Sequence, residues 1–127
     1  MTTQIGIGFS RDPNIEKAAK EAALEAKATS KAEKIDFALI LSTIHYDPNR
    51  TLPVISKILN HKKLIGSSTA GIILSHSIET RGLSVLTLTS SDIKIGAGSV
   101  ANIHPDNMHQ SGIVLAKNSI ADFGNQR

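Results

Sequence analysis

The spacing of hydrophobic and polar residues at the start of the chain predicts a strand followed by a helix. Residues 4–10 alternate apolar side chains with glycine, which is typical of a short strand. Asp12 and Pro13 come next, and they favour a helix start, since aspartate caps the first N–H groups and proline fits the first turn. From Asn14 to about Ser30, alanines recur at helical spacing with lysine and glutamate opposite. We expect this helix to pack closely on its neighbour.

The middle of the chain predicts two further strands with a helix between them. The apolar run at 34–44 is continuous, as in a central strand that is covered on both faces. After a polar loop, apolar residues from Leu52 to Leu59 return at helical spacing and predict a second helix that ends near His61. The stretch KKLIGSST then predicts a third strand, which enters the loop IGSSTAG at 65–71.

The pattern changes after residue 70. The stretches 71–75, 82–90 and 92–100 follow one another too closely for helices to intervene, so they predict antiparallel hairpins or a meander. Asp106 then favours the start of a helix that runs to the C-terminus. The buried face of this helix would consist of Met108, Gly112, Leu115, Ala116, Ser119 and Phe123.

Together these elements predict an α/β fold. A mixed β-sheet would be flanked by helices in the order β-α-β-α-β, followed by antiparallel hairpins and the C-terminal helix. No internal repeat, linker or low-complexity segment is evident, so residues 1–127 are expected to form a single domain.

The predicted topology places polar residues from three loops at one edge of the sheet. If the first three strands are parallel, with right-handed crossovers, their C-terminal ends meet there, and ligands of open α/β sheets bind at that edge. We therefore expect a ligand site built from these strand-end residues: Ser10, Arg11, Thr43, His45, Tyr46, Gly66, Ser67, Ser68, Thr69 and Gly71.

The stretch IGSSTAG supports two interpretations. Gly66 and Gly71 would let backbone N–H groups converge on a carboxylate, with Ser67, Ser68 and Thr69 adding hydroxyls. Alternatively, it is a tight connection whose hydroxyls bond to their own backbone. It is not a P-loop, because no Gly-Lys-Ser/Thr follows, and it is not a nucleophile elbow, because its spacing is not G-x-S-x-G.

Three further features also have more than one interpretation. Arg11 would pair bidentately with a ligand carboxylate, or simply be solvated before the helix. His45 with Tyr46 would hydrogen-bond a ligand or cap a loop. The glycines at 6 and 8 make a weak nucleotide motif without the third glycine, and room for the alanine helix is enough to explain them.

The amino-acid composition argues against several classes of function. The net charge is only +3, and there is no Trp, one Tyr and three Phe, so the basic patches and stacking platforms of nucleic-acid binders are missing. With no cysteine, disulfides and thiolate chemistry are excluded. No apolar run approaches the length of a membrane span and no signal peptide is evident, so we expect a cytoplasmic chain that does not insert into membranes.

The sequence does not predict catalysis or a metal site. The histidines are scattered, and none has a partner four residues away on a helix, so no metal ligands are assigned. A hydrolase built from Ser67, His45 and Asp47 is unconvincing, because one residue between the His and the Asp is too few to orient the ring. No catalytic residue is assigned, and we expect no enzyme.

Four stretches resemble the N-terminal part of the FIST domain family over nearly the whole chain. They are GIGFSRDP with the alanine-rich helix after it, DFALILST followed by HYD, LIGSSTAGIILS, and ETRGLSVLTLTS with the turn into IKIGAGSV. The family consists of small-ligand sensory modules of signal-transduction proteins, so the resemblance implies an intracellular domain that binds an amino acid or similar small carboxylate. The alternative is a structural, self-associating module that has lost its pocket.

The chain also departs from the pattern of the family. Members commonly carry Cys at the position of Ser67 and Glu at that of Ile72, so roles of that thiol or carboxylate do not carry over. Haem, which some members are thought to bind, needs an axial histidine in an apolar pocket, and the sequence singles out none, so no cofactor is expected. The family domain continues beyond this length toward a signalling output domain. The resemblance thus implies either a fragment of a longer protein or a short version that completes its sheet or pocket as a homo-oligomer.

Overall fold

The computed structural model describes residues 2–124, and the chain divides between Ser91 and Asp92 into two compact units. The first unit contains a mixed sheet with strand order β1-β6-β2-β3. Its strands are β1 (Thr3–Ser10), β2 (Ile35–Ser42), β3 (His61–Ser68) and β6 (Leu83–Ser90). β2 pairs parallel with β3, whereas β6 is antiparallel to both β1 and β2. The expected α/β architecture is confirmed.

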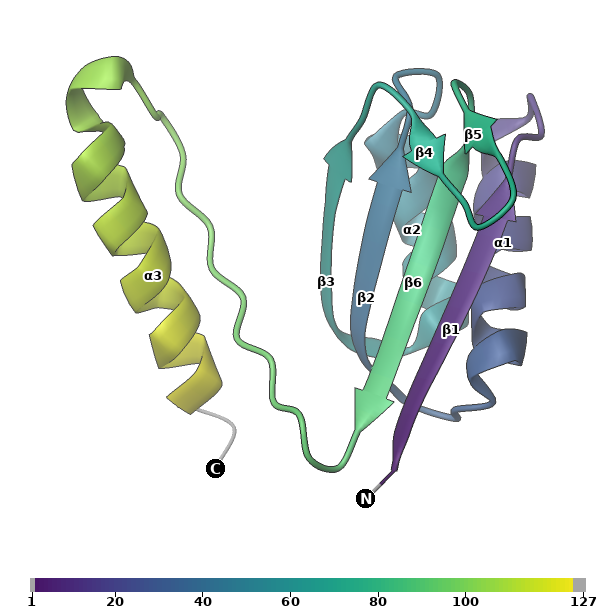
Figure 1. Cartoon of the computed structure of the whole chain (residues 1–127), viewed down its shortest axis with the longest axis horizontal. Helices are drawn as coiled ribbons and strands as arrows, with labels where there is room; N and C mark the ends of the chain where they lie inside the picture. Colours follow the sequence, from purple (N-terminus) through teal and green to yellow (C-terminus); the bar gives the residue numbers. More distant parts are fainter. Residues whose placement is uncertain (1, 125–127) are drawn as a thin grey trace. The chain divides into compact units, whose positions relative to one another are not determined.

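Two helices cover one face of this sheet (Figure 1). They are α1 (Ile15–Ser30) and α2 (Pro48–Leu59). The start of α1 differs from the prediction, because Asn14 is the N-cap and accepts a bond from the N–H of Lys17. Asp12 accepts instead from the N–H of Asn14, in the turn before the helix. Asp47 caps α2 through the N–H of Asn49.

Side chains alternate along the strands, so the sheet has one tightly buried face and one open, apolar face. Toward the helices, Gly6 and Gly8 lie in register with Thr87 and Val85 of β6, and alanines of α1 cover them. A Cβ atom at Gly8 would lie 1.9 Å from the carbonyl oxygen of Ala22, so these glycines allow the close approach of α1. On the opposite face Ile5 and Ile7 remain about half exposed.

A small hairpin lies over the open face. Its strands are β4 (Ile72–Ile73) and β5 (Ile78–Glu79), which pair antiparallel. In Figure 1 the hairpin is in front of the sheet and both helices are behind it. After the hairpin, β6 returns to the middle of the sheet, between β1 and β2, rather than extending a meander.

The second unit contains an extended segment and a helix. After a 3₁₀ turn at Pro105–Asn107, α3 spans Met108–Gly124. His104 precedes the turn, its N–H donates to Oδ1 of Asn107, and its carbonyl accepts from the N–H of Asn107. The stretch 92–100, which was expected to be a strand, is an extended segment outside the sheet that packs along α3. Within residues 2–124, no helix is long and apolar enough to cross a bilayer.

Candidate functional site

The sheet brings the ends of three strands to a common edge. β1, β2 and β3 run in the same direction, because β6 is antiparallel to both of its neighbours. Their C-terminal ends therefore share one edge, as expected. However, β6 separates β1 from β2, so the strand-end residues are spread along this edge rather than gathered at one point.

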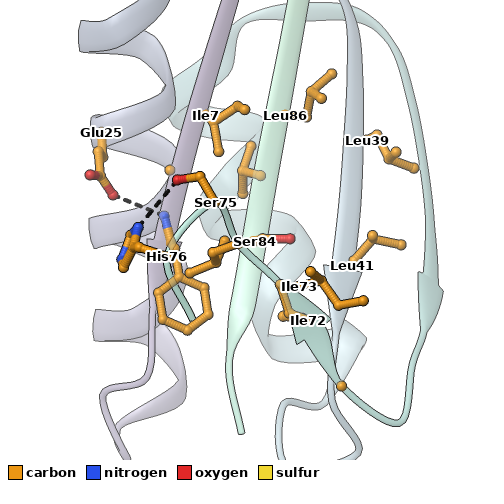
Figure 2. Close-up of a pocket in the computed structure, with 15 residues that line it drawn as sticks. Ile7, Glu25, Leu39, Leu41, Ile72, Ile73, Ser75, His76, Ser84 and Leu86 are labelled. Atoms are coloured by element: carbon orange, nitrogen blue, oxygen red, sulfur yellow. Dashed lines mark hydrogen bonds between the residues drawn. The ribbon is translucent and has the colours of Figure 1, made fainter. Parts of the chain in front are cut away.

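A pocket of about 740 Å³ lies beside this edge, between the open face of the sheet and the hairpin. Its walls are mostly aliphatic. Ile7, Leu86 and Leu39 come from one row across β1, β6 and β2, and Phe9 and Leu41 come from the next row. Ile72 and Ile73 of β4 line the hairpin side of the pocket (Figure 2); Ile72 is buried, whereas Ile73 is largely exposed. The volume falls within the usual range for small-molecule sites.

Four polar side chains line the same pocket: Glu25, Ser75, His76 and Ser84. Glu25 reaches over the edge of β1 and accepts from the N–H of Phe9 at 2.9 Å. The Oγ atom of Ser75 and Nδ1 of His76 lie 3.3 Å apart (Figure 2). Because the His76 side chain is exposed, it does not offer the enclosed apolar setting that an axial haem ligand needs.

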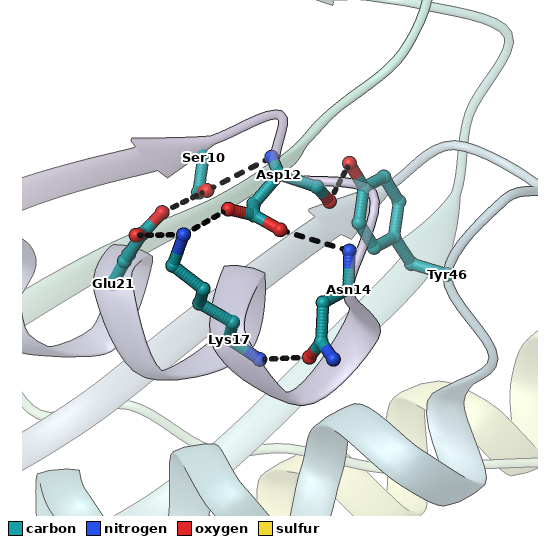
Figure 3. Close-up of polar contacts among 6 residues, drawn as sticks. All are labelled: Ser10, Asp12, Asn14, Lys17, Glu21 and Tyr46. Atoms are coloured by element: carbon teal, nitrogen blue, oxygen red, sulfur yellow. Dashed lines mark hydrogen bonds and ion pairs between the residues drawn. The ribbon is translucent and has the colours of Figure 1, made fainter.

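Ser10 and Tyr46, two of the expected ligand residues, are engaged within the protein (Figure 3). Ser10 is buried; its hydroxyl donates to Glu21 at 2.6 Å and accepts from the N–H of Asp12. The Tyr46 hydroxyl donates to the carbonyl of Asp12 at 3.0 Å. A hydrogen bond from Lys17 lowers the pKa of Asp12. These contacts hold the turn between β1 and α1, so Ser10 and Tyr46 have a structural role.

Thr43 and His45 follow the end of β2. The Thr43 hydroxyl is buried, accepts from the N–H of Gly82 at 3.2 Å, and lies 3.0 Å from Nδ1 of His45. These bonds attach the start of β6 to the end of β2. The His45 side chain is exposed, so it has a free path to solvent at the edge.

The stretch from Gly66 to Gly71 does not form the expected anion loop. β3 continues through Ser68, in register with Ser42, so Gly66 and Ser67 are strand residues. Within residues 2–124 no glycine has positive φ, and the N–H of Thr69 donates to the carbonyl of Ser42 at 2.9 Å. The hydroxyls of Ser67 and Thr69 donate to carbonyls in their own stretch. The N–H groups therefore do not converge as a nest requires.

Arg11 and the β3 serines cannot hold one small carboxylate together. Three strand spacings separate β1 from β3, which is about 14 Å. The Arg11 guanidinium instead lies 3.6 Å from the carboxylate of Glu79, and its side chain is 74% exposed. Glu79 pairs with Ile72 of the pocket wall. Arg11 is thus connected to the pocket through the hairpin.

Of the residues expected from the sequence to bind a ligand, Gly71 lines the pocket; sequence reasoning missed the other lining residues, although part of the signal was present. Ile7 and Phe9 alternate with glycines, which shows that β1 has two different faces. In β6, both Val85 and Leu86 are apolar, which indicates cover on both sides. What no pattern revealed is that β4 would be the cover. Among residues 2–124, no group of three or more His, Asp or Glu could hold a metal ion.

Comparison with known families and structures gives one informative match. The sequence model of the FIST N domain matches residues 36–125. Among curated proteins, none matches the chain. A solved structure of CetZ1 from Haloferax volcanii, the GDP-bound monomer, is similar with a TM-score of 0.42 and 12% identity, over 91% of this chain and 34% of that one. The chain spans about a third of that structure's length, and a likeness this weak supports no statement on function.

Proposed function

The chain belongs to the FIST N domain family of sensory domains in signalling proteins, and we propose that it binds a small carboxylate ligand with an apolar part, such as an apolar amino acid. The observation that carries this proposal is the aliphatic pocket under the β4–β5 hairpin, beside the edge where the strands end. The domain would sense the ligand and release it unchanged.

The pocket favours an apolar ligand body. Rows of Ile, Leu and Phe form its floor, and the buried Ile72 of the hairpin lies opposite them. Burying a ligand side chain of the size of leucine there would contribute about 2 kcal/mol. Ser84 lies between Phe9 and Leu41 in the floor and offers a hydroxyl to a polar group of the ligand.

Arg11 is the cation best placed to bind the carboxylate. Its ion pair with Glu79 is 3.6 Å long, and the Arg11 side chain is largely exposed, so the pair contributes little by itself. A ligand carboxylate would replace Glu79 at the guanidinium and form a bidentate contact. This exchange would free one end of the hairpin, and the resulting shift in hairpin conformation would be passed to a signalling partner.

The other expected ligand residues at the strand ends fall into two groups: some hold the loops in place, and others are exposed at the rim of the pocket. Ser10, Thr43, Tyr46, Thr69 and Gly71 hold the loops in place through the bonds described above. His45, Gly66, Ser67 and Ser68 are exposed at the rim, where they would contact a longer ligand. Ser67 shares a cross-strand row with Leu41, so it is nearest to the pocket of this group.

A thermal-shift screen with two variants and a control tests the proposal. At 100 times its dissociation constant, an apolar amino acid should raise the wild-type unfolding midpoint by several degrees. Arg11→Ala should weaken binding tenfold or more, whereas Glu79→Gln should strengthen it by removing the competing carboxylate. Arg50→Ala is the control, because Arg50 pairs with Glu16 between the helices.

Three results would contradict the proposal. The first is a flat screen against the twenty amino acids and small dicarboxylates with a well-folded protein, which would favour the structural, self-associating module instead. The second is ligand affinity that is unchanged in Arg11→Ala. The third is turnover of any hit, which would replace sensing by catalysis.

A further inference from the structure

The second unit repeats the packing of β1 against α1. A Cβ atom at Gly6 would lie 1.9 Å from the carbonyl oxygen of Ala26, and one at Gly8 would lie 1.9 Å from that of Ala22, four residues earlier. In the second unit, a Cβ atom at Gly96 would lie 2.2 Å from the carbonyl oxygen of Ser119, and one at Gly98 would lie 2.8 Å from that of Leu115, again four residues earlier. The extended segment 93–100 therefore lies on α3 as β1 lies on α1.

The side-chain contacts along one edge repeat as well. In the first unit, the N–H of Ile7 donates to Thr29, three residues after Ala26. In the second unit, the N–H of Ala97 donates to Asp122 at 2.7 Å, three residues after Ser119. At the next equivalent position, Asn118 donates to the carbonyl of Ser99 at 3.1 Å. The helix thus covers the same edge of both segments.

The opposite edge differs between the two units. The N–H groups of successive strand residues point to opposite edges. Ile7 and Phe9 direct theirs toward α1, so Gly6 and Gly8 direct theirs toward β6, with which β1 forms an antiparallel ladder. At the equivalent positions, the backbones of Gly96 and Gly98 make no hydrogen bond to the described residues of their own unit, 92–124. Among the described residues of α3, Met108–Gly124, only Ser111 is buried. Within its own unit, the edge formed by Gly96 and Gly98 therefore lacks the neighbouring strand that β6 provides to Gly6 and Gly8 of β1.

We propose that residues 93–100 pair antiparallel with the same segment of a second copy of this chain. The equivalent edge of β1 takes an antiparallel strand, and a segment that pairs antiparallel with itself generates a closed two-fold dimer. With Ala97 on the two-fold axis, Gly96 opposes the partner copy's glycine at 98, and Lys94 opposes its valine at 100. No like charges meet.

In this dimer, the two residue pairs next to the two-fold axis consist of glycines. Their lack of side chains leaves room for both α3 helices on one face of the two-stranded ribbon. In the described structure Leu115, Ile120 and Phe123 of α3 are 39%, 70% and 46% exposed. Each helix would cover part of this apolar surface on its partner. Both the unfilled edge and the exposed helix face are then explained by one interface.

Single cysteines test the register directly, since the natural chain has none. Ala97→Cys should form a disulfide-linked dimer under mild oxidation, because residues opposite one another at a non-hydrogen-bonded pair have Cα atoms about 4.5 Å apart. Ser99→Cys is the matched control on the same strand face. Its two sulfurs would be separated by four residues along the ribbon, so it should remain uncoupled.

Charge provides a second test that does not depend on oxidation. Val100→Lys would place two lysine pairs face to face and weaken dimerisation roughly tenfold, whereas Val100→Glu would strengthen it by a similar factor. Light scattering over a range of concentrations measures both. A chain that is monomeric at all concentrations would overturn the proposal, as would a dimer in which the cysteines at 97 and 99 couple equally well.

Discussion

Glycine and alanine determine how closely α1 approaches the sheet. Gly6 and Gly8 face Ala22 and Ala26, and there is no space for a single methyl group between them. The sequence suggested this role, and the structure confirms it. What appeared to be the start of a nucleotide motif is a packing feature.

Gly8→Ala should therefore destabilise the protein severely. The new Cβ atom would meet backbone atoms of α1 at 1.9 Å, which cannot move without displacing the helix. We expect a loss of about 3 kcal/mol or more in the free energy of unfolding, measured by chemical denaturation. Gly112→Ala is the control, because nothing lies within 4 Å and alanine favours a helix by up to about 1 kcal/mol. Equal effects would contradict this account.

His61 should make stability depend on pH. Burial lowers the pKa of its imidazole from the usual 6.5, and Nδ1 is buried without a partner among the described residues. The unfolded chain therefore takes up the proton first, so the free energy of unfolding should fall as pH drops below about 6.5 and level off below the folded pKa. His61→Gln should flatten this decline in denaturation curves between pH 7 and 5. The exposed His109→Gln should leave it unchanged, and a wild-type decline that persists in His61→Gln would refute the assignment.

The elements were easier to predict than their arrangement. The hydrophobic pattern identified α1, α2 and the four long strands, because each contains apolar residues in a run or at helical or strand spacing. It could not place β6 between β1 and β2, since alternation shows which side chains share a face but not which strands are neighbours. The stretch 92–100 has the pattern expected of a strand, but the structure shows it as an extended segment outside the sheet.

Asp36 joins three strands at the end of the sheet opposite the site. Its carboxylate accepts from Lys62 of β3 at 2.6 Å and from the N–H of Ser90 of β6 at 3.0 Å, and the bond from Lys62 lowers its pKa below 3.8. Asp36→Asn should cost about 1 kcal/mol at neutral pH. Because the stabilisation is lost as pH falls through the lowered pKa, variant and wild type should converge in acid. Asp106→Asn, at an exposed position, serves as control; a difference that persists undiminished in acid would argue against the ion pair.

At the scale of the whole molecule, the sequence predicted the family and the edge of the sheet but not the site. Insertion of β6 separated Arg11 from Ser67 and Ser68, which a simple parallel order would have brought closer. The pocket depends on a hairpin whose strands have only two residues each, too short for a periodic signal. Local patterns determine strands and helices, whereas a pocket depends on how distant segments are arranged.

The central claim, that an apolar carboxylate binds under the hairpin, is tested most directly by NMR. An amide correlation spectrum of the labelled chain would be recorded while a mixture of leucine, isoleucine, valine and phenylalanine is added. We predict saturable shifts at Phe9, Ser84 and residues 71–76, with Arg11 and Glu79 also affected, and no comparable shifts in α3. Spectra that do not change at millimolar ligand, or shifts confined to residues 92–124, would contradict the account.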